Sequence, residues 1–151
     1  MNAIPIPPVT HTPDGLDGVA WNVLGQVYIP KEITDERFTW LAVFPEETFV
    51  PPHTHAGQDE FLLPLDGEID VVIGGQRGRV QQGQVGHLPR GVPHGFYNNT
   101  GKPVTALFWA TPAGDLVALY RRLHNVGSAA RATSMAPSCG VVFEPPVSSA
   151  A

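Results

Sequence analysis

Short apolar segments separated by turn residues constrain the fold of this chain most strongly. In the first segment, Val19, Trp21, Val23, Gly25, Val27 and Ile29 occupy alternate positions, the period of two that gives a strand one buried face. Further segments follow at intervals of roughly 8–12 residues, with glycine, proline or Asp-Gly between them. They are Phe38–Phe44, Thr48–His55, Glu60–Leu65, Glu68–Ile73, Gln76–Val80, Val85–Leu88, Val92–Asn98 and Val104–Ala110. This pattern predicts an all-β domain, a small antiparallel sandwich or closed β-barrel.

Composition divides the chain into four segments. Residues 1–18 are rich in proline and glycine and are expected to form an extended N-terminal arm, whereas residues 19–112 carry the strands of the barrel. Residues 113–125 are predicted to form a short C-terminal helix, with acidic and basic side chains placed to suit its dipole. Residues 126–151 are expected to be a tail, in which the apolar segment 140–146 is a candidate edge segment that returns to the barrel.

The predicted helix carries one apolar stripe. Leu116, Leu119, Tyr120 and Leu123 recur at helical spacing. The simplest interpretation of this stripe is that it packs on the outside of the barrel.

Charge and length exclude several classes of protein. The net charge is −5 and no run of Lys or Arg occurs, which argues against nucleic acid as a partner. The chain has no apolar stretch long enough to span a membrane and no signal peptide at Met1, and its single cysteine, Cys139, cannot form an intramolecular disulfide. We therefore expect a cytoplasmic protein with neither a membrane nor a nucleic-acid partner.

Three histidines and one glutamate form the strongest candidate site. His53 and His55 stand two positions apart on a predicted strand, so both imidazoles point to the same face. Glu60 begins the next strand, and His94 follows a bend rich in proline and glycine. Three imidazoles and one carboxylate suit one divalent transition metal, Fe, Mn, Ni, Co, Cu or Zn, and are too rich in nitrogen for Ca²⁺ or Mg²⁺. An octahedral ion would keep two positions open.

These four residues stand in two motifs that resemble those of the cupins. The family's patterns are G-x5-H-x-H-x(3,4)-E-x6-G and G-x5-P-x-G-x2-H-x3-N. The matching stretches are His53-x-His55-x4-Glu60-x6-Gly67 and Gly83-x5-Pro89-x-Gly91-x2-His94-x3-Asn98. Glu47 replaces the first glycine of the family, which belongs to a turn. The resemblance covers roughly residues 19–110 and implies a double-stranded β-helix, or jelly roll, with His53, His55, Glu60 and His94 as metal ligands.

Within that family the chain is most similar to small single-domain proteins grouped with quercetin 2,4-dioxygenase. The stretches that carry this similarity are Pro51–His55, Leu88–His94, Thr111–Gly114 and Gly140–Pro146. The similarity implies a metal-dependent dioxygenase that acts on a small enol or phenolic molecule, with Glu60 also serving as the base. It also implies a homodimer. Two alternatives remain: a non-redox metal-dependent isomerase, lyase or decarboxylase, and a cupin that binds a small molecule without turnover.

Strand parity gives a candidate substrate pocket. Phe49 shares the parity of His53 and His55, Leu62 that of Glu60, and Phe96 that of His94. Phe108 is a further candidate, although no ligand fixes its face. These side chains either line an apolar pocket above the metal or fill the interior of a narrow barrel.

Overall fold

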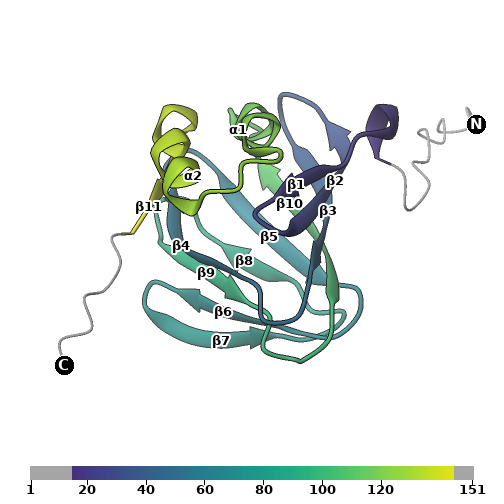
Figure 1. The fold of residues 1–151 in the computed structure, drawn as a ribbon. Coiled ribbons are helices and arrows are strands. Elements are labelled where there is room, and N and C mark those ends of the chain that lie inside the picture. Colours follow the sequence, from purple (N-terminus) through teal and green to yellow (C-terminus); the bar gives the residue numbers. More distant parts are fainter. Residues whose placement is uncertain (1–14, 145–151) are drawn as a thin grey trace, which may run out of the picture.

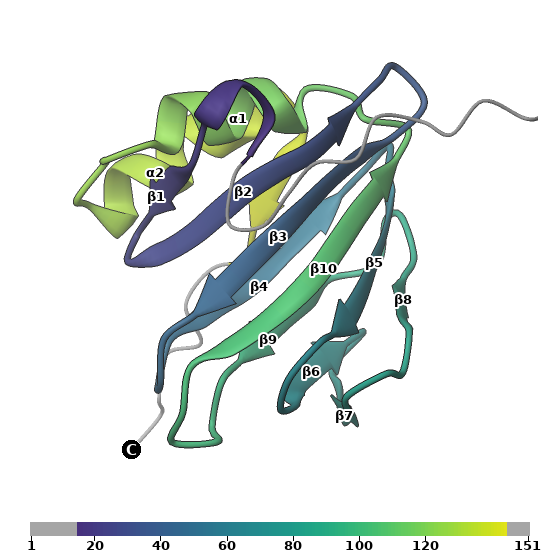
Figure 2. The same cartoon turned by 90° about the vertical axis from the view of Figure 1, so that its right-hand side faces the viewer.

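Two antiparallel sheets face each other and enclose the core. The structure is a computed structural model that describes residues 15–144. The six-stranded sheet has the spatial order β1 (Trp21–Val23), β2 (Gln26–Ile33), β3 (Phe38–Phe44), β10 (Val104–Thr111), β5 (Asp59–Pro64) and β8 (Gly86–Leu88). The five-stranded sheet has the order β11 (Val141–Phe143), β4 (Phe49–His55), β9 (His94–Tyr97), β6 (Ile69–Ile73) and β7 (Gln76–Val80). Figures 1 and 2 show the two layers, and the predicted all-β antiparallel architecture is confirmed.

Strand register places large apolar side chains in the space between the sheets. β10 lies between β3 and β5, where Phe108 pairs with Trp40 on one side and with Leu62 on the other. All three side chains are buried, and alternate residues of β10 are buried along its whole length. The rings of Trp40 and Phe108 stack with centroids 5.4 Å apart. Phe108 also meets Phe96 of the facing sheet, with ring centroids 5.3 Å apart, so the aromatic layer joins the two sheets.

The first predicted strand is in fact a hairpin. Leu24 and Gly25 both adopt positive φ, 52° and 88°, and form the two-residue turn between β1 and β2. The positive φ values at both positions match the twist of a tight hairpin. The turn also changes which residues face inward, so that Gln26 and Tyr28 are buried and Val27 is exposed.

Glu47 lies in the turn before β4 at the position where the cupin motif has glycine. Its φ is 62°, a left-handed conformation that glycine adopts with the least strain. The backbone N–H of Glu47 donates to Asn98 O at 3.0 Å, which ties this turn to the end of β9. The turn therefore places a non-glycine residue in a conformation that favours glycine.

Two helices follow the last long strand. α1 (Leu116–Leu123) lies within the predicted helix, whereas α2 (Ala129–Met135) lies in the segment predicted to be a tail. The Ser128 hydroxyl accepts a hydrogen bond from Arg131 N at 3.2 Å and caps the N-terminus of α2. Short 3₁₀ segments occur at Leu16–Gly18 and Ala136–Cys139, and β11 then pairs with β4 along the sheet edge.

The position of α1 corrects the prediction from its apolar stripe. Both helices lie over one end of the two sheets (Figure 1), and α1 does not pack on the outer face of the barrel. Leu116, Leu119 and Leu123 are buried, and together with Tyr120 they line a cavity that also contacts His53 and His55. The amphipathic pattern was correct, but it could not identify the surface that the helix covers.

Some predictions about the termini fall outside the described residues. Residues 1–14 of the predicted N-terminal arm lie outside the described residues. Residues 145 and 146 of the candidate edge segment also lie outside them. None of the helices between residues 15 and 144 has the length and apolar character required to cross a bilayer.

We expect Phe108→Ala to destabilise the domain by about 3–5 kcal/mol, because it would leave a large cavity between Trp40 and Leu62. Urea denaturation followed by circular dichroism measures the change. Leu107→Ala on the same strand is the control, since Leu107 is only partly buried. Equal losses for the two variants would contradict the assignment of the core to the Phe108 face.

Candidate metal centre

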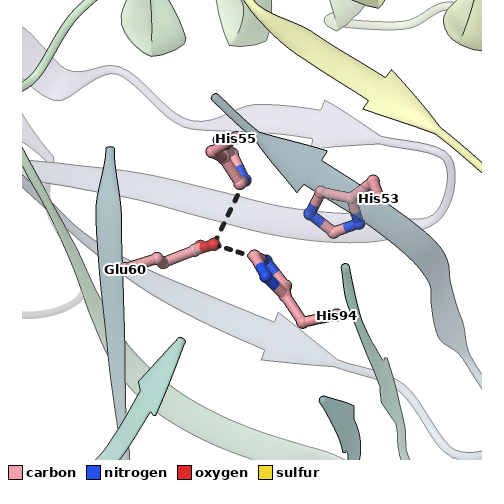
Figure 3. A group of neighbouring side chains, drawn as sticks. All are labelled: His53, His55, Glu60 and His94. Carbon is pink, nitrogen blue, oxygen red and sulfur yellow. Dashed lines mark hydrogen bonds and ion pairs between the residues drawn. The ribbon is translucent and has the colours of Figure 1, made fainter. Parts of the chain in front are cut away.

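Four side chains from three strands converge between the sheets. His53 and His55 come from β4, Glu60 from β5 and His94 from β9, and all four are buried. One potential ligand atom from each residue lies within 4.8 Å of the others. Figure 3 shows the four side chains directed toward one point, with Glu60 between His55 and His94. The structure thus brings together all four residues that the sequence predicted as ligands.

Backbone pairing explains this convergence. His53 is the cross-strand partner of His94, and His55 lies two positions further along the same face of β4. Glu60 pairs with Ala110 on one side and Leu88 on the other, so it belongs to the six-stranded sheet. Its buried side chain faces the histidines of the five-stranded sheet.

The loop before His94 is held against β4. Gly91 adopts a positive φ of 75°, and its N–H donates to His55 O at 2.9 Å. Glycine tolerates this conformation, so the loop can approach the strand that carries two of the histidines. Gly91 of the second motif therefore has a structural role.

Hydrogen bonds assign the protonated nitrogen of two imidazoles. His53 Nδ1 lies 2.8 Å from Pro51 O, and a carbonyl can only accept. His55 Nδ1 lies 3.2 Å from Gln58 Oε1. The amide nitrogen of Gln58 donates to Pro112 O, so the amide oxygen is the atom that faces His55 and accepts from it. Both rings therefore carry the proton on Nδ1 and present the lone pair of Nε2 to the centre.

Glu60 is the charged member of the cluster. Its Oε2 lies 2.9 Å from His94 Nε2 and 3.2 Å from His55 Nε2. Burial would raise the pKa of Glu60, but the charge and hydrogen bonds of His55 and His94 outweigh burial and hold this pKa well below its usual value. Glu60 is therefore an ionised carboxylate in the interior.

The two histidines of β4 differ in their electrostatic surroundings. Burial, reinforced by His94 and His55, lowers the pKa of His53 to about 3, so its ring is neutral. Burial also acts to lower the pKa of His55, but the Glu60 carboxylate outweighs it and raises that pKa above its ordinary value. In the absence of a metal, a proton on His55 would compensate the buried carboxylate.

These residues fit a divalent transition metal. His55 Nε2 is completely buried and, apart from its ion-pair contact with Glu60, has no hydrogen-bond partner among the described residues. A buried nitrogen without a well-placed partner is unfavourable unless it binds a proton or a metal ion. The four candidate ligand atoms lie within 4.8 Å of one another, so His53, His55, Glu60 and His94 would together hold one ion.

A mainly apolar cavity of about 170 Å³ opens beside the cluster. Its walls come from β1, β2, β4, β11 and the two helices, and His53 and His55 line its inner end. The polar groups in its walls include Gln26, Tyr28 and Tyr120. The Tyr28 hydroxyl donates to Gln26 Oε1 at 2.7 Å, while Gln26 Nε2 donates to Phe49 O at 3.2 Å. Burial, followed by the charge of Glu60, raises the pKa of Tyr28, so its hydroxyl stays neutral.

The four predicted substrate-binding residues separate into two groups. Phe49 lines the cavity and is 59% exposed, so it lies at the mouth of the cavity rather than beside the metal. A shift of register between Val50 and His53 interrupts the regular pairing that the parity argument assumed. Leu62, Phe96 and Phe108 are buried in the core and are not among the residues that line the cavity.

Sequence reasoning missed several residues around the cluster. The Leu24-Gly25 turn reverses the parity of Gln26 and Tyr28, and recognising that turn would have placed both inside. Tyr120 was identified only as part of an apolar stripe, whereas it lines the cavity. Gln58 contacts residues more than fifty positions away, and no local sequence signal reveals such a partner.

Comparison with known proteins agrees with this architecture. The profile of the cupin domain (Cupin_2) matches residues 40–110, which include all four clustered residues. The chain contains a cupin domain. A quercetin 2,3-dioxygenase from Bacillus subtilis (strain 168) is 29% identical over 75 residues, which are 50% of this chain and 22% of that protein. The chain thus corresponds to a small part of that relative, and the relation is distant.

Solved structures share the cupin fold. The protein TT1209 from Thermus thermophilus has a TM-score of 0.55 and 25% identity, over 58% of this chain and 83% of that one. An RmlC-like cupin from Shewanella frigidimarina has a TM-score of 0.60 and 16% identity, over 66% of this chain and 87% of that one. Both similarities support the double-stranded β-helix.

We expect the purified protein to bind about one equivalent of a divalent transition metal, and His94→Ala to lose it, because the other three ligands no longer enclose the ion. Elemental analysis after dialysis against Co²⁺ or Zn²⁺ measures the content. His87→Ala is the matched control, since His87 lies outside the cluster and its side chain is 53% exposed. Metal retention in His94→Ala equal to that of the control would rule out this centre.

Proposed function

We propose that this cupin is a metal-dependent dioxygenase of the quercetinase-like type, acting on a small enol or phenolic substrate. The observation that carries the proposal is a buried cluster of three histidines and one glutamate at the inner end of an apolar cavity. When bound, a divalent transition metal supplies Lewis acidity and open coordination positions. The distant relation to a quercetin 2,3-dioxygenase supports the same reaction class.

The walls of the cavity favour a substrate whose body is uncharged. Among the described residues that line it, none is Lys, Arg, Asp or Glu. Recognition of a phosphate or a remote carboxylate usually needs a guanidinium or ammonium group, because burying an unpaired charge is unfavourable. Apolar side chains from β1, β4 and α1 suit a compact hydrophobic or planar molecule instead. A phenol or enol would present one oxygen toward the histidines.

Glu60 is the ionised carboxylate of the cluster, and it contacts His55, which lines the cavity. Its lowered pKa keeps the carboxylate ionised, and its Oε2 faces the imidazoles of His55 and His94. The hydroxyl proton of the substrate would pass to a carboxylate oxygen of Glu60, leaving an electron-rich enolate or phenolate. The apolar cap formed by α1 and α2 would exclude bulk water from that anion.

We expect metal-loaded protein to consume dioxygen in the presence of a suitable flavonol or β-diketone. The test reconstitutes the protein separately with Fe²⁺, Mn²⁺, Ni²⁺, Co²⁺ and Cu²⁺ and follows oxygen uptake with an electrode. His94→Ala treated in the same way is the blank. Conversion of a substrate without oxygen uptake would instead support the non-redox isomerase, lyase or decarboxylase, and thermal stabilisation without a product would support a binding protein.

Glu60→Gln separates metal binding from proton transfer. The amide keeps an oxygen that can coordinate the ion but cannot accept the substrate proton, so kcat should fall by about 10²–10⁴-fold while most of the metal is retained. Metal content and oxygen uptake are measured on the same preparation. Parallel loss of metal and activity would show that Glu60 acts only as a ligand.

A further inference from the structure

Gln58 connects the candidate metal centre to the start of helix α1. It lies in the short connection between β4 and β5, and its side chain is almost completely buried. Its Oε1 accepts from His55 Nδ1 at 3.2 Å. Its Nε2 donates to Pro112 O at 3.0 Å and also to Ala113 O. The amide oxygen thus bonds to a predicted ligand, and the amide nitrogen bonds to the backbone before α1.

The backbone that Gln58 contacts determines where α1 begins. Ala113 O also accepts from Leu116 N at 3.4 Å, and Leu116 is the first residue of α1. Gly114 is packed so closely that an added Cβ would lie 2.9 Å from Gln58 Nε2. Since α1 contributes four side chains to the cavity wall, a shift of this segment would change how the cavity is closed.

The strength of the hydrogen bond between Gln58 Oε1 and His55 Nδ1 depends on what His55 Nε2 binds. His55 carries its proton on Nδ1 and presents Nε2 to the cluster. A cation on Nε2 draws electron density from the ring and makes Nδ1–H a stronger donor, as for other metal-bound histidines with a hydrogen-bonded partner. The contact with Gln58 is then strengthened, and Gln58 remains oriented toward the two carbonyls.

We propose that Gln58 is a positioning residue that couples metal binding at His55 to closure of α1 over the cavity. The coupling rests on the metal centre of the proposed function and is independent of the dioxygen reaction. Coupling free energies are reciprocal. A bound metal therefore stabilises the position of α1, and a disturbance at the start of α1 weakens metal binding.

Two substitutions of Gln58 separate the two ends of its side chain. In Gln58→Glu the carboxylate still accepts from His55 Nδ1 but has no N–H for the two carbonyls. In Gln58→Leu both contacts are lost. The probe is Zn²⁺ alone, with its Kd measured by chelator competition and the α1 amides followed by hydrogen–deuterium exchange with and without the ion.

In the wild-type protein, Zn²⁺ should slow exchange in α1 at least about fivefold. This protection should disappear in both variants. The Kd should stay within a few-fold of wild type in Gln58→Glu and weaken about 10–100-fold in Gln58→Leu, as for other partners of metal-bound histidines. If Gln58 had a purely structural role, its substitution would change the stability of the metal-free and the Zn²⁺-bound protein equally. The difference in α1 exchange between these two forms would then remain.

A substitution on the helix side tests reciprocity without mutating Gln58 or any candidate ligand. In Gly114→Ala the added methyl would displace the Gln58 amide, so Zn²⁺ affinity should fall about fivefold or more. Gly101→Ala is the matched control, because Gly101 also has a positive φ, 76° against 53° for Gly114, so both substitutions strain the backbone, but its added Cβ would meet no atom within 4 Å. This pair carries the test if the Gln58 variants do not fold.

The outcomes distinguish the coupling from the metal centre itself. If the wild-type protein binds no Zn²⁺, both the coupling and the proposed function are overturned. If it binds Zn²⁺ but exchange in α1 does not change, or Gly114→Ala binds as tightly as Gly101→Ala, the coupling is overturned and the metal centre stands.

Discussion

The buried carboxylate of Glu60 is the constraint on which the site depends. An ionised group in the interior is unfavourable unless charges or hydrogen bonds compensate it, and here His55 and His94 provide that compensation. The cluster therefore requires a cation in some form, either a proton on an imidazole or a metal ion. The same requirement explains why four polar side chains can lie among the aromatic residues of a small barrel without disrupting it.

The barrel and its cap have different roles around this charge. The barrel supplies rigidity, since the four polar residues belong to paired strands and Phe96 packs against His94 with ring centroids 5.4 Å apart. The cap supplies the shape of the cavity, because α1 and α2 line much of its wall. Gln58 connects the clustered His55 to the backbone before α1, while Asn22 of β1 bonds to His124 and Asn125 at the other end of the helix. Changes in the cap can therefore alter the substrate without rebuilding the ligands.

The sequence predicted the parts that depend on local patterns. Alternation along the strands and the two spaced motifs led to the antiparallel barrel and to the grouping of His53, His55, Glu60 and His94. It failed where a single backbone feature reversed a pattern. The turn at Leu24-Gly25 placed Gln26 and Tyr28 inward and Val27 outward, although Ile29 is buried as predicted. The register shift in β4 carried Phe49 to the mouth of the cavity. The placement of α1 and the partners of Gln58 depend on contacts between distant residues, which periodicity cannot reveal.

The last described strand has a consequence for the order of assembly during synthesis. β11 pairs with β4 so that Val141 lies opposite His55 and Phe143 opposite His53. The strand that carries two of the four clustered residues thus keeps an open edge until nearly the whole described chain has left the ribosome. The barrel strands can pair before that moment, whereas the cavity gains its final wall only when Val141 and Phe143 dock. During synthesis, the cavity beside His53 and His55 therefore stays open on this side until the last described strand has docked.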